Sequence, residues 1–263
     1  MEWIVVDDGS DPTNAAEHCE VVHSVSSAVR TDFIEISERV GLSKARNLGI
    51  ARAHGDWVVV LDSDDKLGSE LVPMLLALPA SSLLVSCNSI YFDENVTEYR
   101  DVQPFAELFL SYGGTSLDPF LWWDFYYHGI IARRSLVDFI GGYRGNLDVG
   151  EDQDILLRAA QVAGKGRVTF LSEVGYEYRK NPEGVCASHW SEILGNYTKT
   201  MLEAAVARAA PFDKCEFGGV DDTTGVSVDF YRYRARDGKW HDWHSWRRIE
   251  PVGRSGNEAY RLR

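Results

Sequence analysis

Three carboxylates stand together at the end of a predicted strand. Asp62, Asp64 and Asp65 directly follow the apolar residues 57–61, whose valines and length are typical of a buried strand. In open α/β sheets, ligands bind beyond the carboxyl ends of the strands. A divalent cation prefers oxygen ligands and would relieve the repulsion between these charges. We therefore interpret this turn as a metal site that could neutralise a diphosphate and assist its departure.

Two other acidic pairs follow or precede predicted elements. Asp7 and Asp8 end a strand at residues 3–6, where they form either a simple turn or a site that hydrogen-bonds the N–H of a nucleotide base. Glu151 and Asp152 open a predicted helix, where capping alone would explain them. The alternative is a general base that takes the proton of an attacking hydroxyl.

Several basic residues also lie at the ends of predicted elements or in predicted loops. Arg46 begins a helix, either on its solvated face or reaching a nucleotide. Arg179 and Lys180 start a polar loop at residues 179–184, which is either an ordinary surface loop or a mobile lid over a diphosphate. His189 follows this loop as either a structural residue or a metal ligand.

An aromatic segment at residues 117–127 is more typical of a core than of a binding site. Aromatic faces also suit sugar rings, so the segment and its neighbours remain a candidate wall for a donor sugar or an acceptor. The residues in question are Trp123, Asp124, Tyr127 and Gly129.

The elements that must position these side chains alternate between strand and helix. We expect strands at residues 3–6, 33–36, 57–61, 83–87 and 129–133, and helices at 43–54, 69–78, 135–140, 151–163 and 188–209, with a hairpin or edge excursion at 89–100. This alternation predicts an α/β fold with a mostly parallel sheet and helices on both faces.

The chain changes character after Pro211. Residues 226–234 and 239–247 are predicted strands joined by an Asp237-Gly238 turn, a strong hairpin signal. We expect one domain at residues 1–210, with its nucleotide-binding part at 1–100 and its acceptor and catalytic part at 101–210. Residues 211–263 then form a small β-rich extension.

Composition excludes several classes of function. The 263 residues carry a net charge of −13, which disfavours a nucleic-acid or anionic-membrane surface. The four cysteines are too widely spaced for a zinc knuckle or redox pair, which favours reduced thiols in a cytoplasmic protein. We find no signal-peptide pattern and no apolar run long enough to span a bilayer.

Taken in order, the motifs resemble those of the family 2 glycosyltransferases of GT-A fold. The resemblance covers roughly residues 3–190 and is carried by residues 5–10, 41–50, 61–65, 141–143 and 150–152. Members usually begin with a further strand that ends in a Pro-Thr-Tyr-Asn-like turn. This chain starts at the next strand, so we expect either an upstream start or a fold that does without the first strand.

The resemblance implies a role for each matching residue. The residues expected to bind the nucleotide are Asp7, Asp8, Ser10, Arg46, Asp62, Ser63, Arg179 and Lys180. Those expected to bind Mn²⁺ or Mg²⁺ are Asp64, Asp62 and His189. Asp152 is expected to act as the general base, with Glu151 in support. Asp65 is the alternative to Asp64 as main metal ligand.

The implied reaction is transfer of a sugar, with inversion, from a nucleotide sugar. The donor is expected to be UDP-linked, and the acceptor a saccharide, a lipid-linked glycan or a small hydroxyl compound. The C-terminal extension contacts the acceptor, forms a homodimer interface or covers the sheet. The rivals are a non-catalytic nucleotide-sugar-binding protein and a nucleotidyltransferase, which would need a glycine-rich triphosphate loop that this sequence lacks.

Overall fold

The computed structural model describes residues 1–26, 28–95, 97–102, 129–147 and 149–181, and three strands between residues 212 and 245. The chain divides into two compact units, Met1–Asn196 and Tyr197–Arg263, and each is described by itself. The helix expected at residues 188–209 lies outside the described residues.

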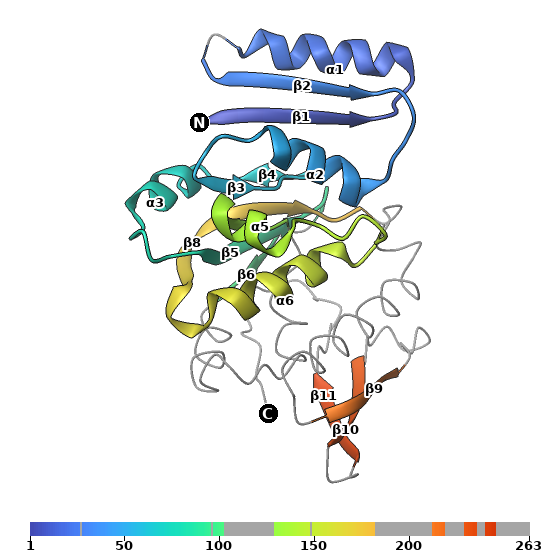
Figure 1. The fold of residues 1–263 in the computed structure, drawn as a ribbon, viewed down its shortest axis with the longest axis vertical. Coiled ribbons are helices and arrows are strands. Elements are labelled where there is room, and N and C mark those ends of the chain that lie inside the picture. Colours follow the sequence, from blue (N-terminus) through green and yellow to red (C-terminus); the bar gives the residue numbers. More distant parts are fainter. Residues whose placement is uncertain are drawn as a thin grey trace. The chain divides into compact units, whose positions relative to one another are not determined.

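The N-terminal strands form a small parallel sheet. Strand β1 (Glu2–Asp8) pairs along its length with β2 (Arg30–Ile36). Helix α1 (Pro12–Ser24) connects them, and Asp11 caps it by accepting hydrogen bonds from two amides of the first turn. Figure 1 shows α1 and α2 (Leu42–Arg52) on opposite sides of this sheet. Gly49 of α2 packs closely on β1, since a Cβ there would lie 3.3 Å from Val6 Cγ2.

The second sheet has six strands and is mixed, so the prediction of a mostly parallel sheet is wrong. Its order is β3 (Trp57–Val59), β7 (Ile131–Arg133), β5 (Leu84–Phe92), β8 (Val168–Arg179) and β4 (Lys66–Leu67), with β6 (Thr97–Arg100) beside β5. Only β5 and β8 are parallel neighbours in this sheet; the β3–β7, β5–β7, β4–β8 and β5–β6 pairs are antiparallel.

The β5–β6 pair has a simple cause, because these consecutive strands form the hairpin that the sequence suggested. The other antiparallel pairs join strands that are far apart in the chain, so their direction follows from tertiary packing. Strands β1 and β3 belong to separate sheets in the described structure. The Glu2 carboxylate of β1 accepts hydrogen bonds from the amides of His54 and Gly55, which precede β3, and so connects the two strands.

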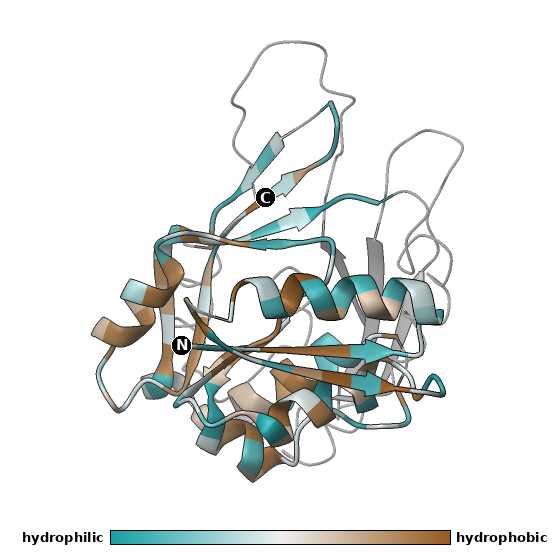
Figure 2. Ribbon diagram, turned by 90° about the horizontal axis from the view of Figure 1, so that it is seen from above, coloured by the Kyte–Doolittle hydropathy of each residue, from teal (hydrophilic) through white to brown (hydrophobic). Residues whose placement is uncertain are grey.

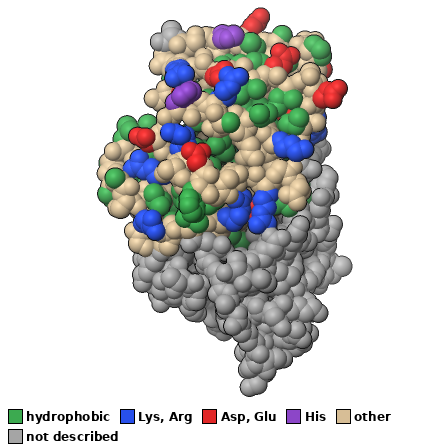
Figure 3. Space-filling view, viewed as in Figure 1, with side chains coloured by type: hydrophobic (Ala, Val, Ile, Leu, Met, Phe, Trp, Pro, Cys, Tyr) green, Lys and Arg blue, Asp and Glu red, His purple; other side chains and the backbone are tan. Residues whose placement is uncertain are grey.

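Helices cover the mixed sheet and close its core. These are α3 (Leu71–Ala77), α5 (Arg134–Ile140) and α6 (Glu151–Ala163), the last with the predicted bounds, followed by the short 3₁₀ turn η2 (Lys165–Arg167). Buried side chains from α3, β5 and β7 form one cluster: Leu71, Leu75, Val85, Cys87 and Ile131. Hydrophobic residues are frequent in the strands, and the helices carry both hydrophobic and hydrophilic residues (Figure 2). Charged side chains of both signs are interspersed on the face in Figure 3.

Strand β8 was not predicted from the sequence. Ser172 and Glu173 are exposed, and the register against β5 shifts near this point, so the strand lacks a continuous alternation. It nevertheless runs for twelve residues and reaches the turn that holds Asp62 and Asp65.

The second unit contains a three-stranded antiparallel sheet of β9 (Phe212–Gly218), β10 (Asp229–Ala235) and β11 (Trp240–Ser245). The pairing of β10 with β11 confirms the predicted hairpin, whereas β9 was not expected. No helix within the described part of the chain is long and apolar enough to cross a membrane.

Candidate active site

One buried guanidinium joins three of the predicted motifs. Arg46 Nη1 contacts Glu151 Oε1 at 2.6 Å and Asp152 Oδ1 at 2.8 Å, and Arg46 Nη2 contacts Asp62 Oδ1 at 2.6 Å. Only 7% of the Arg46 side chain is exposed. The interpretation of Arg46 as a solvated residue on a helix face is therefore wrong.

The fold brings these groups together from three elements. Asp62 follows strand β3, Glu151 and Asp152 form the first turn of α6, and Arg46 lies in α2. Carboxylates in a first turn also suit the partial positive charge of a helix N-terminus. Asp62 and Asp152 keep 33% and 25% of their side chains exposed, so both remain reachable from solvent.

The turn at Tyr143 supports this cluster. The Arg46 guanidinium lies 5.2 Å from the centre of the Tyr143 ring. Asn47, the next residue in α2, holds the backbone of Tyr143 by two hydrogen bonds, accepting from its amide at 2.8 Å and donating to its carbonyl at 2.7 Å. Arg158 of α6 donates to the carbonyls of Ile140 and Gly142.

The acidic pair holds protons more tightly than isolated carboxyls. Burial raises the pKa of Glu151, the negative charge of Asp152 raises it further, and the Arg46 charge opposes both effects. Burial also raises the pKa of Asp152 against the opposing charge of Arg46. Three carboxylates around one guanidinium leave an excess of negative charge, so the pair retains a proton to a higher pH than an isolated acid would.

Asp65 anchors the acidic turn rather than facing solvent. Its Oδ2 accepts a hydrogen bond from the Tyr176 hydroxyl at 2.9 Å, and its Oδ1 accepts one from the Arg179 amide at 2.7 Å. Burial raises the pKa of Asp65 to about 6, with the charges of Asp62 and Asp64 adding to the effect. This carboxylate therefore fastens the turn to β8.

Asp64 has the opposite environment. Its side chain is exposed, as is that of Ser63, and no described residue donates a hydrogen bond to the Asp64 carboxylate. Asp62 and Asp64 thus offer oxygen atoms of the kind that Mn²⁺ or Mg²⁺ prefers. The described residues contain no cluster of three or more potential metal ligands, and His189 lies outside them.

Asp7 and Asp8 have partners within the N-terminal part of the fold. Asp7 accepts hydrogen bonds from the Ser10 amide and His18 Nδ1, both at 2.9 Å. Asp8 accepts from the amides of Val40 and Gly41, at 2.7 and 3.0 Å. Burial acts to raise the pKa of Asp7, but these hydrogen bonds outweigh it and the pKa is lowered. Asp8 therefore fixes the loop that leads into α2, and Asp7 fixes the turn before α1 and contacts α1 itself. The contact of either acid with a nucleotide base stays a prediction.

The basic pair also lies near the acidic turn. Arg179 ends strand β8 rather than starting a loop, and its Nε donates to the Asp64 carbonyl at 3.0 Å while its guanidinium lies 4.9 Å from the centre of the Phe92 ring. Lys180 Nζ contacts Glu98 Oε1 at 2.5 Å. Arg179 is therefore next to the candidate metal ligand. Residues 182–184 of the loop predicted at 179–184 lie outside the described residues, so its role as a lid stays a prediction.

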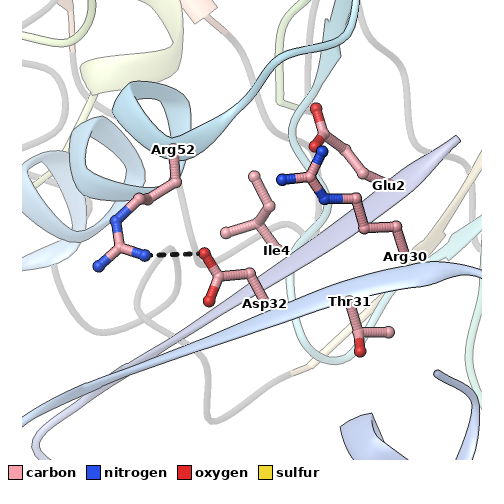
Figure 4. Close-up of a pocket in the computed structure, with 6 residues that line it drawn as sticks. All are labelled: Glu2, Ile4, Arg30, Thr31, Asp32 and Arg52. Atoms are coloured by element: carbon pink, nitrogen blue, oxygen red, sulfur yellow. Dashed lines mark hydrogen bonds and ion pairs between the residues drawn. The ribbon is translucent and has the colours of Figure 1, made fainter.

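The predicted sugar pocket is mostly outside the described structure. Trp123, Asp124 and Tyr127 are not described, and Gly129 packs against the backbone, since a Cβ there would lie 2.6 Å from the Val60 carbonyl oxygen. A different pocket lies at the amino ends of β1 and β2, opposite the Asp7–Asp8 end of the sheet (Figure 4). Its Arg52 and Asp32 pair with each other at 2.9 Å, and none of the predicted site residues lines it.

Three residues that position the site were not predicted from the sequence as site residues. Tyr176 and Asn47 were assigned no role, and Tyr143 was noted only as part of a motif. The alternation of apolar and polar residues at 174–178 was the available signal for Tyr176. The adjacency of Asn47 to Arg46 gave no indication of its contact with Tyr143, which lies 96 residues away in the chain.

The fold and site define an α/β protein of GT-A type. The structure matches the S. aureus TarS fragment solved with UDP-GlcNAc at a TM-score of 0.56 and 19% identity, over 78% of this chain and 56% of that one. It matches the mannosyltransferase PcManGT of Pyrobaculum calidifontis, solved with GDP-Man and Mn²⁺, at a TM-score of 0.51 and 16% identity, over 78% and 55%. At these identities the likeness establishes the fold alone.

The family model described as glycosyl transferase family 2 matches residues 1–141, more than half of the chain. The chain belongs to this family. It is 26% identical to EpsH of Bacillus subtilis (strain 168), which carries the name of a glycosyltransferase, over 219 residues. These cover 79% of this chain and 58% of EpsH, so the chain spans less than two thirds of this relative.

Proposed function

We propose that this protein transfers a sugar from a nucleoside-diphosphate sugar to a hydroxyl acceptor, with a divalent cation and with inversion at the anomeric carbon. The observation that carries the proposal is the shared contact of Asp62 and Asp152 with Arg46. It supports a single site in which the donor, beside the acidic turn, lies next to a potential base.

The two acids of α6 differ in access, which favours Asp152 as the base. Its side chain is 25% exposed, whereas that of Glu151 is 6% exposed. Burial raises the pKa of Asp152, the charge of Arg46 opposes this effect, and the charge of Asp62 adds to it. A base must reach the hydroxyl whose proton it takes, so exposure as well as pKa selects Asp152.

The reaction balances with these groups. The acceptor oxygen attacks the anomeric carbon and forms the new glycosidic bond, its proton passes to Asp152, and the bond between that carbon and the diphosphate oxygen breaks. The leaving diphosphate takes the electron pair. Attack from the face opposite the leaving group inverts the configuration.

Asp64 and Asp62 are the described residues that would hold Mn²⁺ or Mg²⁺, with His189 as the further candidate. The exposed Asp64 carboxylate fits this role, because ionised carboxylates are strong ligands for hard cations. When bound, the cation supplies positive charge that stabilises the departing diphosphate. Asp65 fits less well because both its oxygens accept hydrogen bonds within the protein.

A UDP-linked donor is part of the proposal. TarS was solved with UDP-GlcNAc and PcManGT with GDP-Man and Mn²⁺, so proteins of this fold bind nucleotide sugars with either base. Asp7 and Asp8 lie at the end of β1, where we expect the base, with Ser10 beside them. The acceptor is proposed to be a saccharide, a lipid-linked glycan or a small hydroxyl compound.

The test begins with donor binding and ends with chemistry. Melting temperatures are measured with UDP, GDP, CDP and ADP, each with and without Mn²⁺, since a ligand of the folded state raises the melting temperature. Release of the diphosphate from the matching nucleotide sugar is then followed, with water as acceptor.

Asp152→Asn should lower this release by about 10²–10⁴-fold while nucleotide binding persists. Asp138→Asn, at an exposed acid of α5 paired with Arg134, is the matched control and should behave as the wild type. Nucleotide binding without any release or transfer by the wild type would favour a non-catalytic binding protein instead.

A further inference from the structure

Arg46 cannot easily leave its carboxylates to contact a ligand. Its Nη1 atom carries two hydrogens, and both face acids, Glu151 at 2.6 Å and Asp152 at 2.8 Å. Glu151 is 6% exposed, so departure of the guanidinium would leave a buried carboxylate without its counter-charge. The contacts favour a permanent place for Arg46 inside the protein.

The surrounding structure holds Arg46 from two directions. The Tyr143 ring lies beneath the guanidinium, and the two hydrogen bonds from Asn47 fix the Tyr143 backbone to the helix that carries Arg46. Ser43, one turn earlier in α2, donates to the Leu147 carbonyl. These contacts fasten helix α2 to the segment that leads into α6. Arg46 therefore lies in a fixed position between Asp62 and the acidic pair of α6.

We propose that Arg46 is a positioning residue that holds the general base Asp152 in place and ties it to Asp62, rather than a residue that contacts the nucleotide. The guanidinium fixes one oxygen of Asp152 and one oxygen of Asp62. The base and the diphosphate-binding turn then keep a constant separation, which suits a single displacement between acceptor and leaving group. This inference rests on the proposed function, because it takes Asp152 as the base.

The role predicts a particular split of kinetic effects. Loss of Arg46 should lower kcat, because Asp152 is no longer held where it takes the proton. It should leave KM for the donor and Kd for the nucleoside diphosphate nearly unchanged, because Arg46 contacts neither of them and the Tyr176 hydroxyl still holds the Asp62 amide and the Asp65 carboxylate. A nucleotide-contacting arginine would show the reverse pattern.

The test uses Arg46→Lys and Arg46→Gln in the full chain, with release of the diphosphate from the donor as the assay and Kd for UDP with Mn²⁺ as the binding measurement. We expect kcat to fall by about 10²-fold or more in Arg46→Gln, within the range of a lost general base, and by less in Arg46→Lys, which keeps the charge. Kd should change by less than about threefold. Arg52→Lys, at an exposed arginine of the same helix, is the matched control.

A double variant tests whether Arg46 acts through Asp152. Once Asp152 is replaced, Arg46 has no base to position, so Arg46→Lys/Asp152→Asn should be no slower than Asp152→Asn. Losses that multiply would overturn the inference, as would a tenfold weaker UDP affinity with unchanged kcat. If Arg46→Gln does not fold, Arg46→Lys and the double variant still decide the question.

Failure of the proposed function has a different signature. In that case the wild type releases no diphosphate from any nucleotide sugar, or Asp152→Asn releases it at the wild-type rate. Neither result depends on Arg46, so the two failures are distinguishable.

Discussion

The Tyr176 hydroxyl donates a hydrogen bond to Asp65 Oδ2 at 2.9 Å and accepts one from the Asp62 amide at 3.3 Å. Tyr176 is fully buried in β8, and burial raises the pKa of its hydroxyl well above the ordinary value. This one side chain therefore links both ends of the acidic turn to the sheet.

Replacing Tyr176 by Phe should loosen the turn. The buried Asp65 carboxylate and the Asp62 amide each lose a partner, which should lower the free energy of unfolding by about 1–3 kcal/mol. We also expect weaker Mn²⁺-dependent binding of UDP, because Asp62 and Asp64 are less well placed. Urea unfolding and a Mn²⁺ titration in the presence of UDP measure the two effects. Unchanged stability would show that the hydroxyl contributes nothing to the turn.

Replacing Asp64 by Asn tests the cation directly. The side chain is exposed, so the free energy of unfolding should stay within about 0.5 kcal/mol of the wild type. Binding of UDP should lose its dependence on Mn²⁺, because the neutral amide is a poorer ligand than a carboxylate. Calorimetry with and without Mn²⁺ makes the comparison, with Asp138→Asn as control. Full retention of the Mn²⁺ effect would remove Asp64 from the ligand set.

Alanine substitutions at two neighbouring glycines distinguish the cost of backbone strain from the loss of the contact between Asn47 and Tyr143. Gly141 and Gly142 both have positive φ, 79° and 68°, so alanine at either position should cost roughly 1–2 kcal/mol. A Cβ at Gly142 would also lie 2.5 Å from Asn47 Oδ1, whereas a Cβ at Gly141 meets nothing within 4 Å. Gly142→Ala should therefore be the more destabilising change and should also lower kcat, through Tyr143 and Arg46. Equal effects of the two variants would argue against this path.

The contact between His18 and Asp7 predicts a pH-dependent effect. Because the pKa of Asp7 is lowered, the stability from its ionised form is present above the ordinary carboxyl pKa and is lost as pH falls through the lowered value. His18 is 54% exposed, so His18→Ala should cost only about 0.5–1 kcal/mol at about pH 6. The difference from the wild type should shrink between about pH 6 and about pH 2, as pH falls toward and through the lowered pKa of Asp7.

Unfolding by urea at the two pH values tests this dependence. His23→Ala is the control, since this residue of the same helix contacts Cys19 rather than an acid. A difference between wild type and His18→Ala that persists undiminished at low pH would separate the effect from the ionisation of Asp7.

Elements with strong local patterns were predictable from the sequence. The bounds of α6 were predicted correctly because its apolar residues recur at helical spacing and glycine precedes and follows it. The acidic turn was placed correctly after its strand, although β3 ends at Val59 rather than at residue 61. Strand direction was mispredicted because the alternation of strands and helices does not reveal short antiparallel strands such as β4 and β7.

The sequence by itself determined which chemical groups the site contains: the acids of the turn after β3, the acidic pair of α6 and the arginine of α2. Only the tertiary structure decided which of them touch. Arg46 and Glu151 are 105 residues apart in the chain yet lie 2.6 Å apart in space. It also separated Asp65, bound within the protein, from the exposed Asp64. The physical reason is that Coulomb interactions and desolvation depend on distance and burial in space, which follow from packing rather than from spacing along the chain.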